Sequence, residues 1–298
     1  MIPERISSTC PYTSHYADIY GSKMHYLEEG VGDPILFLHG IPTSSYLWRN
    51  IIPYIMPLGR CIAPDLIGMG KSAKPNIEYT IADHIRYIEK FIETLNLNNL
   101  ILVLHGWGSV IGLDYAMRHE KNCRGIAFYE AFLRPFHQED ISLPLYEQVI
   151  SLQEQTTAPD LTQHGVNFVD QIITQGVMRK LSEAEKNQYR EPFSKPGTGK
   201  PLQQYLKEFP HGDGKSKADQ LITQYSKKLS HSKLPKLMLY SVPGFITTIG
   251  TAMWARDTLP NLELVDIGEE LHFAQESHPK LIGETVSIWL QGIETGTA

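Results

Sequence analysis

The stretch Val103-Leu104-His105-Gly106-Trp107-Gly108-Ser109 decides the fold of this 298-residue chain. Residues 99–104 are almost continuously apolar and include β-branched side chains, as is typical of a buried parallel strand. From Ser109 to about Glu120 the pattern predicts a helix packed behind that strand. A strand that enters a helix through a tight, glycine-containing turn is the layout of a nucleophile elbow, which exposes one side chain at the top of a sheet. Here the exposed position is Gly106, which has no side-chain atom that can attack a substrate.

Strand and helix patterns alternate on both sides of this turn. Apolar runs predict strands at residues 23–28 (an exposed edge strand), 34–38, 60–64, 125–129, 236–240 and 262–266. Helical patterns cover residues 46–55, 80–95, 248–259 and 278–290, and Thr80 is placed to cap the second of them. Such βα alternation predicts a mostly parallel central sheet with helices on both faces.

The alternation stops from about residue 133 to residue 231. This part contains helical patterns at 145–155, 161–177 and 182–189, followed by a stretch rich in Pro, Gly and Lys at 192–217 that resembles a loop. Helices inserted between two sheet strands are what a cap over an active site would look like. We therefore predict a main domain of residues 1–132 and 232–298, with a helical cap subdomain of residues 133–231.

Composition narrows the class of protein. The hydrophobic content of 42% is ample for a sizeable core, and the formal net charge of -6 gives no electrostatic footprint for nucleic acid or an anionic membrane. No run approaches the ~20 apolar residues of a membrane span, and residues 1–22 lack the apolar core of a signal peptide. The three cysteines, Cys10, Cys61 and Cys123, follow no metal-binding spacing. We expect a soluble cytoplasmic protein with free thiols and no bound metal; its oligomeric state is not readable from the sequence.

Three stretches together carry a resemblance to a known family. His39-Gly40-Ile41-Pro42-Thr43-Ser44-Ser45-Tyr46-Leu47-Trp48-Arg49-Asn50 resembles the oxyanion loop of haloalkane dehalogenases. Asp65-Leu66-Ile67-Gly68-Met69-Gly70-Lys71-Ser72 and Leu271-His272-Phe273-Ala274-Gln275-Glu276 resemble two further loops of that family, the second containing its catalytic histidine. The resemblance extends over nearly the whole chain, including 181–193 in the cap, and points to the branch that also contains the luciferase of sea pansies. It implies an α/β-hydrolase fold with an inserted helical cap.

The resemblance also implies roles for individual residues. In that family an aspartate at the elbow attacks the carbon that bears the halogen, and a histidine oriented by an acid then activates water to hydrolyse the alkyl–enzyme ester. The matching histidine is His272, the matching acid is Glu130, and Trp107 matches a tryptophan that donates its N–H to the leaving halide. Two positions depart from the family: the aspartate is replaced by Gly106, and a halide-binding asparagine by Ile41. We therefore expect the hydrolysis of alkyl halides to be absent or very weak.

Each of these residues also has a less specific interpretation. His272 can act as a base near pH 7 or be a surface-loop histidine. Glu130 ends an apolar strand, where a hydrogen bond to His272 would satisfy its carboxylate, but it could equally be solvated. Trp107 can be core packing alone. Ile41 is most simply a pocket wall, although its backbone N–H can still contribute to an oxyanion hole.

Other motifs fail on spacing. Ser109 is not a nucleophile of the G-x-S-x-G type, because Trp107 and Ile111 occupy the required glycine positions, so we expect it to pack or cap the helix. Gly70-Lys71-Ser72 does not complete a phosphate-binding loop, since Asp65 stands where the first glycine is needed. Gly106 to Gly112 departs from the dinucleotide fingerprint at Ile111. We predict no cofactor.

Three hypotheses about function remain open. The first is an enzyme of altered chemistry, in which His272 and Glu130 act as a base pair for general-base hydrolysis or cofactor-free oxygenation. The second is a non-catalytic protein that binds a small ligand, and the third is a dehalogenase in an inactive form. All three expect a small apolar or halogenated organic molecule in the pocket and neither nucleic acid nor a membrane as partner.

Overall fold

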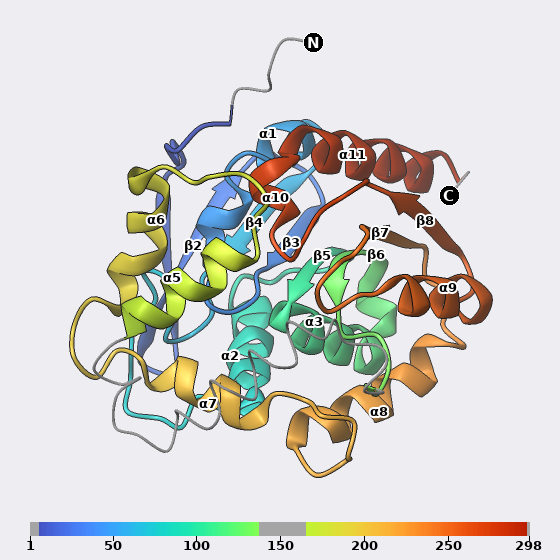
Figure 1. The fold of residues 1–298 in the computed structure, drawn as a ribbon. Coiled ribbons are helices and arrows are strands. Elements are labelled where there is room, and N and C mark those ends of the chain that lie inside the picture. Colours follow the sequence, from blue (N-terminus) through green and yellow to red (C-terminus); the bar gives the residue numbers. More distant parts are fainter. Residues whose placement is uncertain (1–5, 137–164, 297–298) are drawn as a thin grey trace.

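The computed structural model describes residues 6–136 and 165–296, and these form a layered α/β structure (Figure 1). Its sheet has eight strands in the order β1-β2-β4-β3-β5-β6-β7-β8. The strands are β1 (Ser14–Ile19), β2 (Ser22–Glu29), β3 (Pro34–Leu38), β4 (Arg60–Pro64), β5 (Leu100–Gly106), β6 (Cys123–Ala131), β7 (Lys236–Tyr240) and β8 (Leu262–Asp266). Neighbours from β4 to β8 run parallel, whereas β2 is antiparallel to both β1 and β4. The predicted mostly parallel sheet is confirmed.

Helices cover both faces of the sheet. The described α-helices are α1 (Ile52–Ile55), α2 (Ile81–Thr94), α3 (Trp107–Arg118), α5 (Gly165–Gln175), α6 (Glu183–Arg190), α7 (Lys200–Glu208), α8 (Lys217–Leu229), α9 (Ile249–Thr258), α10 (Ala274–Ser277) and α11 (Pro279–Thr295). Helices α1 and α11 pack together on one face, and α2, α3 and α8 lie on the other (Figure 1). Short 3-10 helices add Ser45–Trp48, Glu120–Asn122 and Glu191–Phe193.

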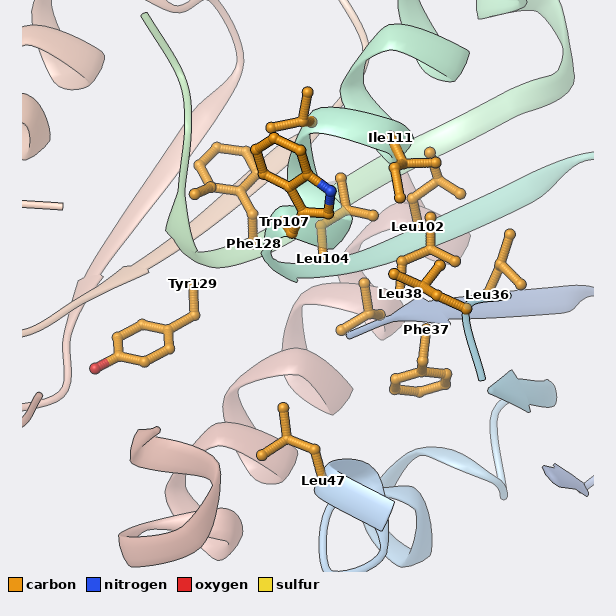
Figure 2. Packing of buried hydrophobic residues seen from close by; sticks show 14 of the residues in the cluster. Leu36, Phe37, Leu38, Leu47, Leu102, Leu104, Trp107, Ile111, Phe128 and Tyr129 are labelled. Atoms are coloured by element: carbon orange, nitrogen blue, oxygen red, sulfur yellow. The ribbon is translucent and has the colours of Figure 1, made fainter. Parts of the chain in front are cut away.

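The core lies where β3 and β5 meet the flanking helices. Leu36 and Leu38 of β3 and Leu102 and Leu104 of β5 are almost fully buried beside Ile111 of α3 (Figure 2). Strands buried on both faces must be apolar along their whole length, which explains why these strands read as continuous apolar runs. The same argument accounts for the correct prediction of β4 and β7.

Helix α2 is confirmed in its cap and its buried face. The Thr80 hydroxyl accepts the backbone N–H of Asp83, and the Asp83 carboxylate accepts the N–H of Thr80, which is a complete capping box. Ile81, Ile88 and Phe91 then point into the core at helical spacing.

Three predictions about secondary structure were wrong. Residues 23–28 form a strand but not an edge strand, because β2 pairs with β1 on one side and with β4 on the other, and Met24 is fully buried. Residues 46–55 are not one helix: a 3-10 turn (Ser45–Trp48) precedes the separate helix α1, because the ring of Pro53 and its missing N–H prevent the turns before it from continuing. Residues 192–217 are not all loop, since Pro201 opens α7, whose Leu202 and Leu206 are buried one turn apart.

The remaining predictions concern the helices of the insertion, the cysteines and membrane spans. The predicted helix at 145–155 lies outside the described residues, and the one at 161–177 is described only as α5. Cys61 and Cys123 are buried and Cys10 is half-buried, all three as free thiols. Within residues 6–136 and 165–296, none of the helices has the length and apolar character needed to cross a membrane.

A buried network of charges joins α6 to the main sheet domain. The Arg49 guanidinium donates from Nη1 to Glu276 Oε1 at 2.6 Å and from Nη2 to Glu276 Oε2 at 2.8 Å. It also reaches Glu185 of α6 at 3.2 Å, and Arg179 contacts both carboxylates. Tyr189 donates its hydroxyl hydrogen to Glu276. The side chain of Arg49 is fully buried, so its charge depends on these partners rather than on water.

Replacing Arg49 with leucine is expected to destabilise the fold by roughly 3–5 kcal/mol, because it leaves the buried Glu276 carboxylate short of its main counter-charge. The measurement is the free energy of unfolding in urea at pH 7. The matched control is Arg60→Leu, which removes a partly exposed pair with Glu28 and should cost no more than about 1 kcal/mol. Equal losses in the two variants would contradict the importance of the buried network.

The buried His84 of α2 predicts a dependence of stability on pH. Neither of its ring nitrogens has a partner among the described residues, and burial, reinforced by His39, lowers its pKa from 6.5 to about 4. Between those two values the unfolded chain binds the proton and the folded chain does not, so stability falls as the pH falls from 6.5 to 4.

Between pH 6.5 and pH 4 the unchanged protein should lose about 3 kcal/mol of stability through His84, at about 1.4 kcal/mol for each pH unit. The variant His84→Leu should not show this part of the loss. The measurement is the free energy of unfolding of both proteins at pH 6.5 and pH 4. If the free energy of unfolding falls equally in both proteins between pH 6.5 and pH 4, His84 takes up its proton in the folded state as it does in the unfolded chain.

Candidate active site

The elbow lies at the junction of β5 and α3. Strand β5 ends at Gly106 and α3 begins at the next residue, and Gly106 has φ +51° and ψ −127°. A Cβ atom built on Gly106 would lie 3.2 Å from His272 Nε2 and 3.3 Å from the Cα of Gly40. A side chain at position 106 would therefore point at the imidazole of His272, in a backbone conformation that strains residues other than glycine.

Gly108 permits the close approach of α3 to the sheet. A Cβ at this position would lie 2.4 Å from the carbonyl oxygen of Leu38 in β3, closer than real Cβ atoms come to any atom. Ser109, predicted correctly as a packing and capping residue, is fully buried. Its hydroxyl donates to the Gly106 carbonyl at 2.6 Å and accepts the N–H of Phe132 at 2.9 Å.

Glu130 and His272 are brought into direct contact. His272 follows β8, and its Nδ1 lies 2.8 Å from Glu130 Oε2. Both residues are buried: His272 is 5% exposed and Glu130 is 1% exposed. A carboxylate can only accept hydrogen bonds, so the shared hydrogen is on Nδ1, and Nε2 is the ring nitrogen that faces position 106.

The Glu130 carboxylate is aimed by a bulge in β6. In the pairing of β5 with β6, His105 lies opposite Tyr129 and Gly106 opposite Ala131, which leaves Glu130 as an extra residue. Glu130 also has the left-handed φ of +50°, which is uncommon for a residue with a side chain.

The carboxylate of Glu130 accepts hydrogen bonds from three consecutive backbone N–H groups. It accepts the backbone N–H groups of Phe245 at 2.9 Å, Ile246 at 2.6 Å and Thr247 at 3.1 Å. Together with the His272 ring, four N–H groups satisfy a charge that has almost no contact with water.

His105 belongs to this cluster and was missed in the sequence analysis. It is fully buried, its Nε2 lies 2.8 Å from the backbone oxygen of His272, and the two ring centres are 4.4 Å apart. Burial, together with the neighbouring His272, holds the pKa of His105 well below its ordinary value, so this ring stays neutral. A neutral His105 donates to the His272 carbonyl and fixes the loop that carries the His272 ring. A histidine next to the elbow, in an otherwise apolar strand, was the available signal.

Trp107 and Ile41 line the same region. Trp107 is the first residue of α3, is 2% exposed and packs edge-on against Tyr205 of α7, with 5.0 Å between the ring centres. It also packs edge-on against Phe132, with 6.1 Å between the ring centres. Ile41 follows Gly40, is 3% exposed and contributes an apolar side chain to the loop beside Gly106.

The described residues hold no group of three or more His, Cys, Asp or Glu side chains arranged for a metal ion. What the arrangement offers is an imidazole held by a carboxylate, the indole of Trp107, and a backbone turn with no side chain at position 106. Such a pair can take a proton from a bound molecule or from water.

The variant Glu130→Gln should lower the stability by roughly 2–4 kcal/mol. The NH₂ group of glutamine is a donor, and it would face backbone N–H donors whose hydrogen bonds the carboxylate accepts. The measurement is the free energy of unfolding at pH 7. As a control, Glu263→Gln changes a carboxylate on the exposed side of β8 and should have little effect. A loss no larger than that of the control would argue against the carboxylate as the anchor of this cluster.

Comparisons with known proteins agree with this geometry. The family model for the alpha/beta hydrolase fold matches residues 33–279, so the molecule is an α/β-hydrolase in its class. A haloalkane dehalogenase of Sphingobium indicum is 38% identical over 282 residues (93% of this chain and 94% of that protein). Another, of Mesorhizobium japonicum, is 34% identical over 295 residues (97% of this chain and 94% of that protein).

Solved structures show the same relationship. The haloalkane dehalogenase DbeA from Bradyrhizobium elkani superposes with a TM-score of 0.89 at 32% identity, covering 95% of this chain and 99% of that one. DatA, the haloalkane dehalogenase from Agrobacterium tumefaciens, gives a TM-score of 0.88 at 33% identity and covers 94% and 97% of the two chains. The chain belongs to the haloalkane dehalogenase family.

Proposed function

We propose that this protein holds a small apolar or halogenated organic molecule in a dehalogenase-type pocket, and that its hydrolysis of alkyl halides is absent or very weak. One observation carries the proposal: the backbone of Gly106 directs a side chain toward His272 Nε2, but no side chain is present. Trp107 and Ile41 are the halide-binding positions of this proposed pocket, and helices α5, α6, α7 and α8 belong to the proposed cap.

The chemistry of carbon–halogen hydrolysis explains the expected loss. In the family reaction a carboxylate at the elbow displaces the halide and forms an ester, and a water activated by the histidine then cleaves that ester. The glycine at position 106 supplies no oxygen for the first displacement, so the water that His272 could activate has no ester to attack. Loss of one member of a catalytic triad lowers the rate on the order of 10^4-fold.

Stabilisation of the leaving halide is also reduced. The indole of Trp107 carries an N–H that can donate to a halide, whereas the aliphatic side chain of Ile41 has no donor. The backbone N–H of Ile41 is the remaining candidate for a second contact. Two departures at the same reacting centre support natural divergence of the pocket more than a single engineered change.

The direct test is Gly106→Asp, assayed for halide release from a panel of bromo- and chloroalkanes. We expect release to rise by at least about 10^2-fold, less than full restoration because Ile41 remains and the Asp backbone is strained. The matched control is Gly106→Asn, which fills the same space without a nucleophile and should release no halide. In Gly106→Asp/His272→Phe, release should stop after one halide per protein, because the ester forms and is not hydrolysed.

Absence of halide release from correctly folded Gly106→Asp would show that the pocket no longer supports carbon–halogen hydrolysis.

The intact contact of His272 with Glu130 favours a second candidate, in which the pair acts as a base on water or on a bound molecule, as in general-base hydrolysis or cofactor-free oxygenation. Calorimetry combined with mass spectrometry of the bound compounds distinguishes this candidate from a binding protein. Binding that leaves every compound unchanged indicates a non-catalytic protein, and conversion that is lost in His272→Phe indicates the base mechanism.

A further inference from the structure

A second cluster of reactive groups lies on β1, β2 and after β4, at the other side of the sheet from β8, which precedes the His272 loop. Ser14 opens the edge strand β1, His25 lies in the neighbouring strand β2, and Asp65 directly follows β4. In the order of the sheet, β3 and β5 separate these strands from β6, which carries Glu130.

The three side chains form a continuous relay. His25 Nδ1 lies 2.8 Å from Asp65 Oδ2, and His25 Nε2 lies 2.9 Å from Ser14 Oγ. His25 and Asp65 are each 1% exposed, whereas Ser14 is exposed at the surface. Acid, imidazole and hydroxyl are therefore connected through the same atoms as in serine hydrolases, with only the hydroxyl open to an arriving molecule.

The direction of the hydrogen bonds follows from the charge on Asp65. Its carboxylate accepts the backbone N–H groups of Ser45 and Lys71, each at 2.7 Å, in addition to the His25 ring. Burial alone would raise its pKa, but the hydrogen bond from His25 and the other donors outweigh burial and lower the pKa to about 2. The ionised carboxylate accepts the hydrogen on His25 Nδ1, which leaves Nε2 as the ring nitrogen that faces the hydroxyl of Ser14 and can accept its hydrogen.

Two neighbours complete the surroundings of the hydroxyl. The Lys71 ammonium lies 3.3 Å from Ser14 Oγ and places a positive charge where an oxyanion would form. Tyr16, two residues along β1, packs edge-on against His25 with 5.3 Å between the ring centres and is 52% exposed. Its ring offers an apolar surface beside Ser14.

We propose that Ser14 is a nucleophilic serine that accepts the acyl group of small carboxylic esters with good leaving groups, such as aryl esters. His25 is its general base, Asp65 orients His25, and Lys71 stabilises the negative charge on the carbonyl oxygen. This site is independent of the pocket at Gly106.

The steps are those of acyl transfer to a serine. The Ser14 oxygen bonds to the ester carbonyl carbon while its proton passes to His25 Nε2, and the tetrahedral oxyanion lies beside the Lys71 ammonium. The bond from carbon to the leaving oxygen then breaks, and the phenol leaves with the proton from His25. Water, deprotonated by His25, cleaves the acyl–serine to a carboxylic acid and restores the Ser14 hydroxyl.

The test is to incubate the full chain with 4-nitrophenyl acetate and to map acetylated peptides by mass spectrometry while following the release of 4-nitrophenol. Ser7 and Ser194 are exposed serines whose hydroxyls have no histidine partner, so they report the background in the same sample. We expect Ser14 to be acetylated at least about tenfold faster than either. Ser14→Ala should remove the release that depends on this site, His25→Asn should reduce acetylation of Ser14 to background, and Ser194→Ala should change nothing.

The proposal is overturned if Ser14 is acetylated no faster than Ser7 and Ser194 and Ser14→Ala releases 4-nitrophenol as fast as the unchanged protein. Acetyl groups found on Lys71 alone would also overturn it, because they would show direct reaction of the amine. Ser14 is exposed at the end of an edge strand, so Ser14→Ala is expected to fold and the comparison decides even if His25→Asn does not.

Discussion

The buried carboxylate of Glu130 is the contact on which the arrangement of the candidate site depends. A charge that is 1% exposed is tolerated only when every lone pair has a donor, and here Phe245, Ile246, Thr247 and His272 provide the donors. The first three lie in the loop after β7 and the fourth in the loop after β8. One carboxylate therefore fixes two loops to the end of β6, and the position of the His272 ring follows from this constraint.

The parts of the fold that were predictable are those decided by local pattern. Continuous apolar runs gave β3, β4 and β7, because strands in the middle of a parallel sheet are buried on both faces. Strand β1 has no such signal: it is an edge strand, and only Ala17 and Ile19 of its six residues are buried. Helix α7 was hidden by the Pro and Gly around it, since its burial depends on contacts with distant parts of the chain rather than on its own composition.

The site was partly predictable for the same reason. The resemblance to the family implied that Glu130 and His272 would pair. Their places at the ends of strands agree with this, because the carboxyl ends of parallel strands share one edge. The bulge that turns Glu130 toward His272 was not predictable, since it results from a shift of pairing between β5 and β6. His105 was overlooked because it lies within a strand whose other members are core residues, and only its contact with the His272 carbonyl reveals a positioning role.

Backbone strain explains how this scaffold keeps its geometry with glycine at position 106. The elbow holds residue 106 at φ +51° because Gly108 must pack against Leu38 and because β5 enters α3 with no intervening loop. At such a φ, a residue with a side chain costs on the order of 1 kcal/mol or more, whereas glycine adopts it freely. A change to glycine at this position therefore relieves strain and leaves the anchors of Glu130 and Ser109 untouched, so selection for stability does not act to remove the elbow. The contact of His272 with Glu130 and the packing of Gly108 against Leu38 therefore do not depend on a side chain at position 106. This independence is the condition under which a different ligand or reaction can use the same site.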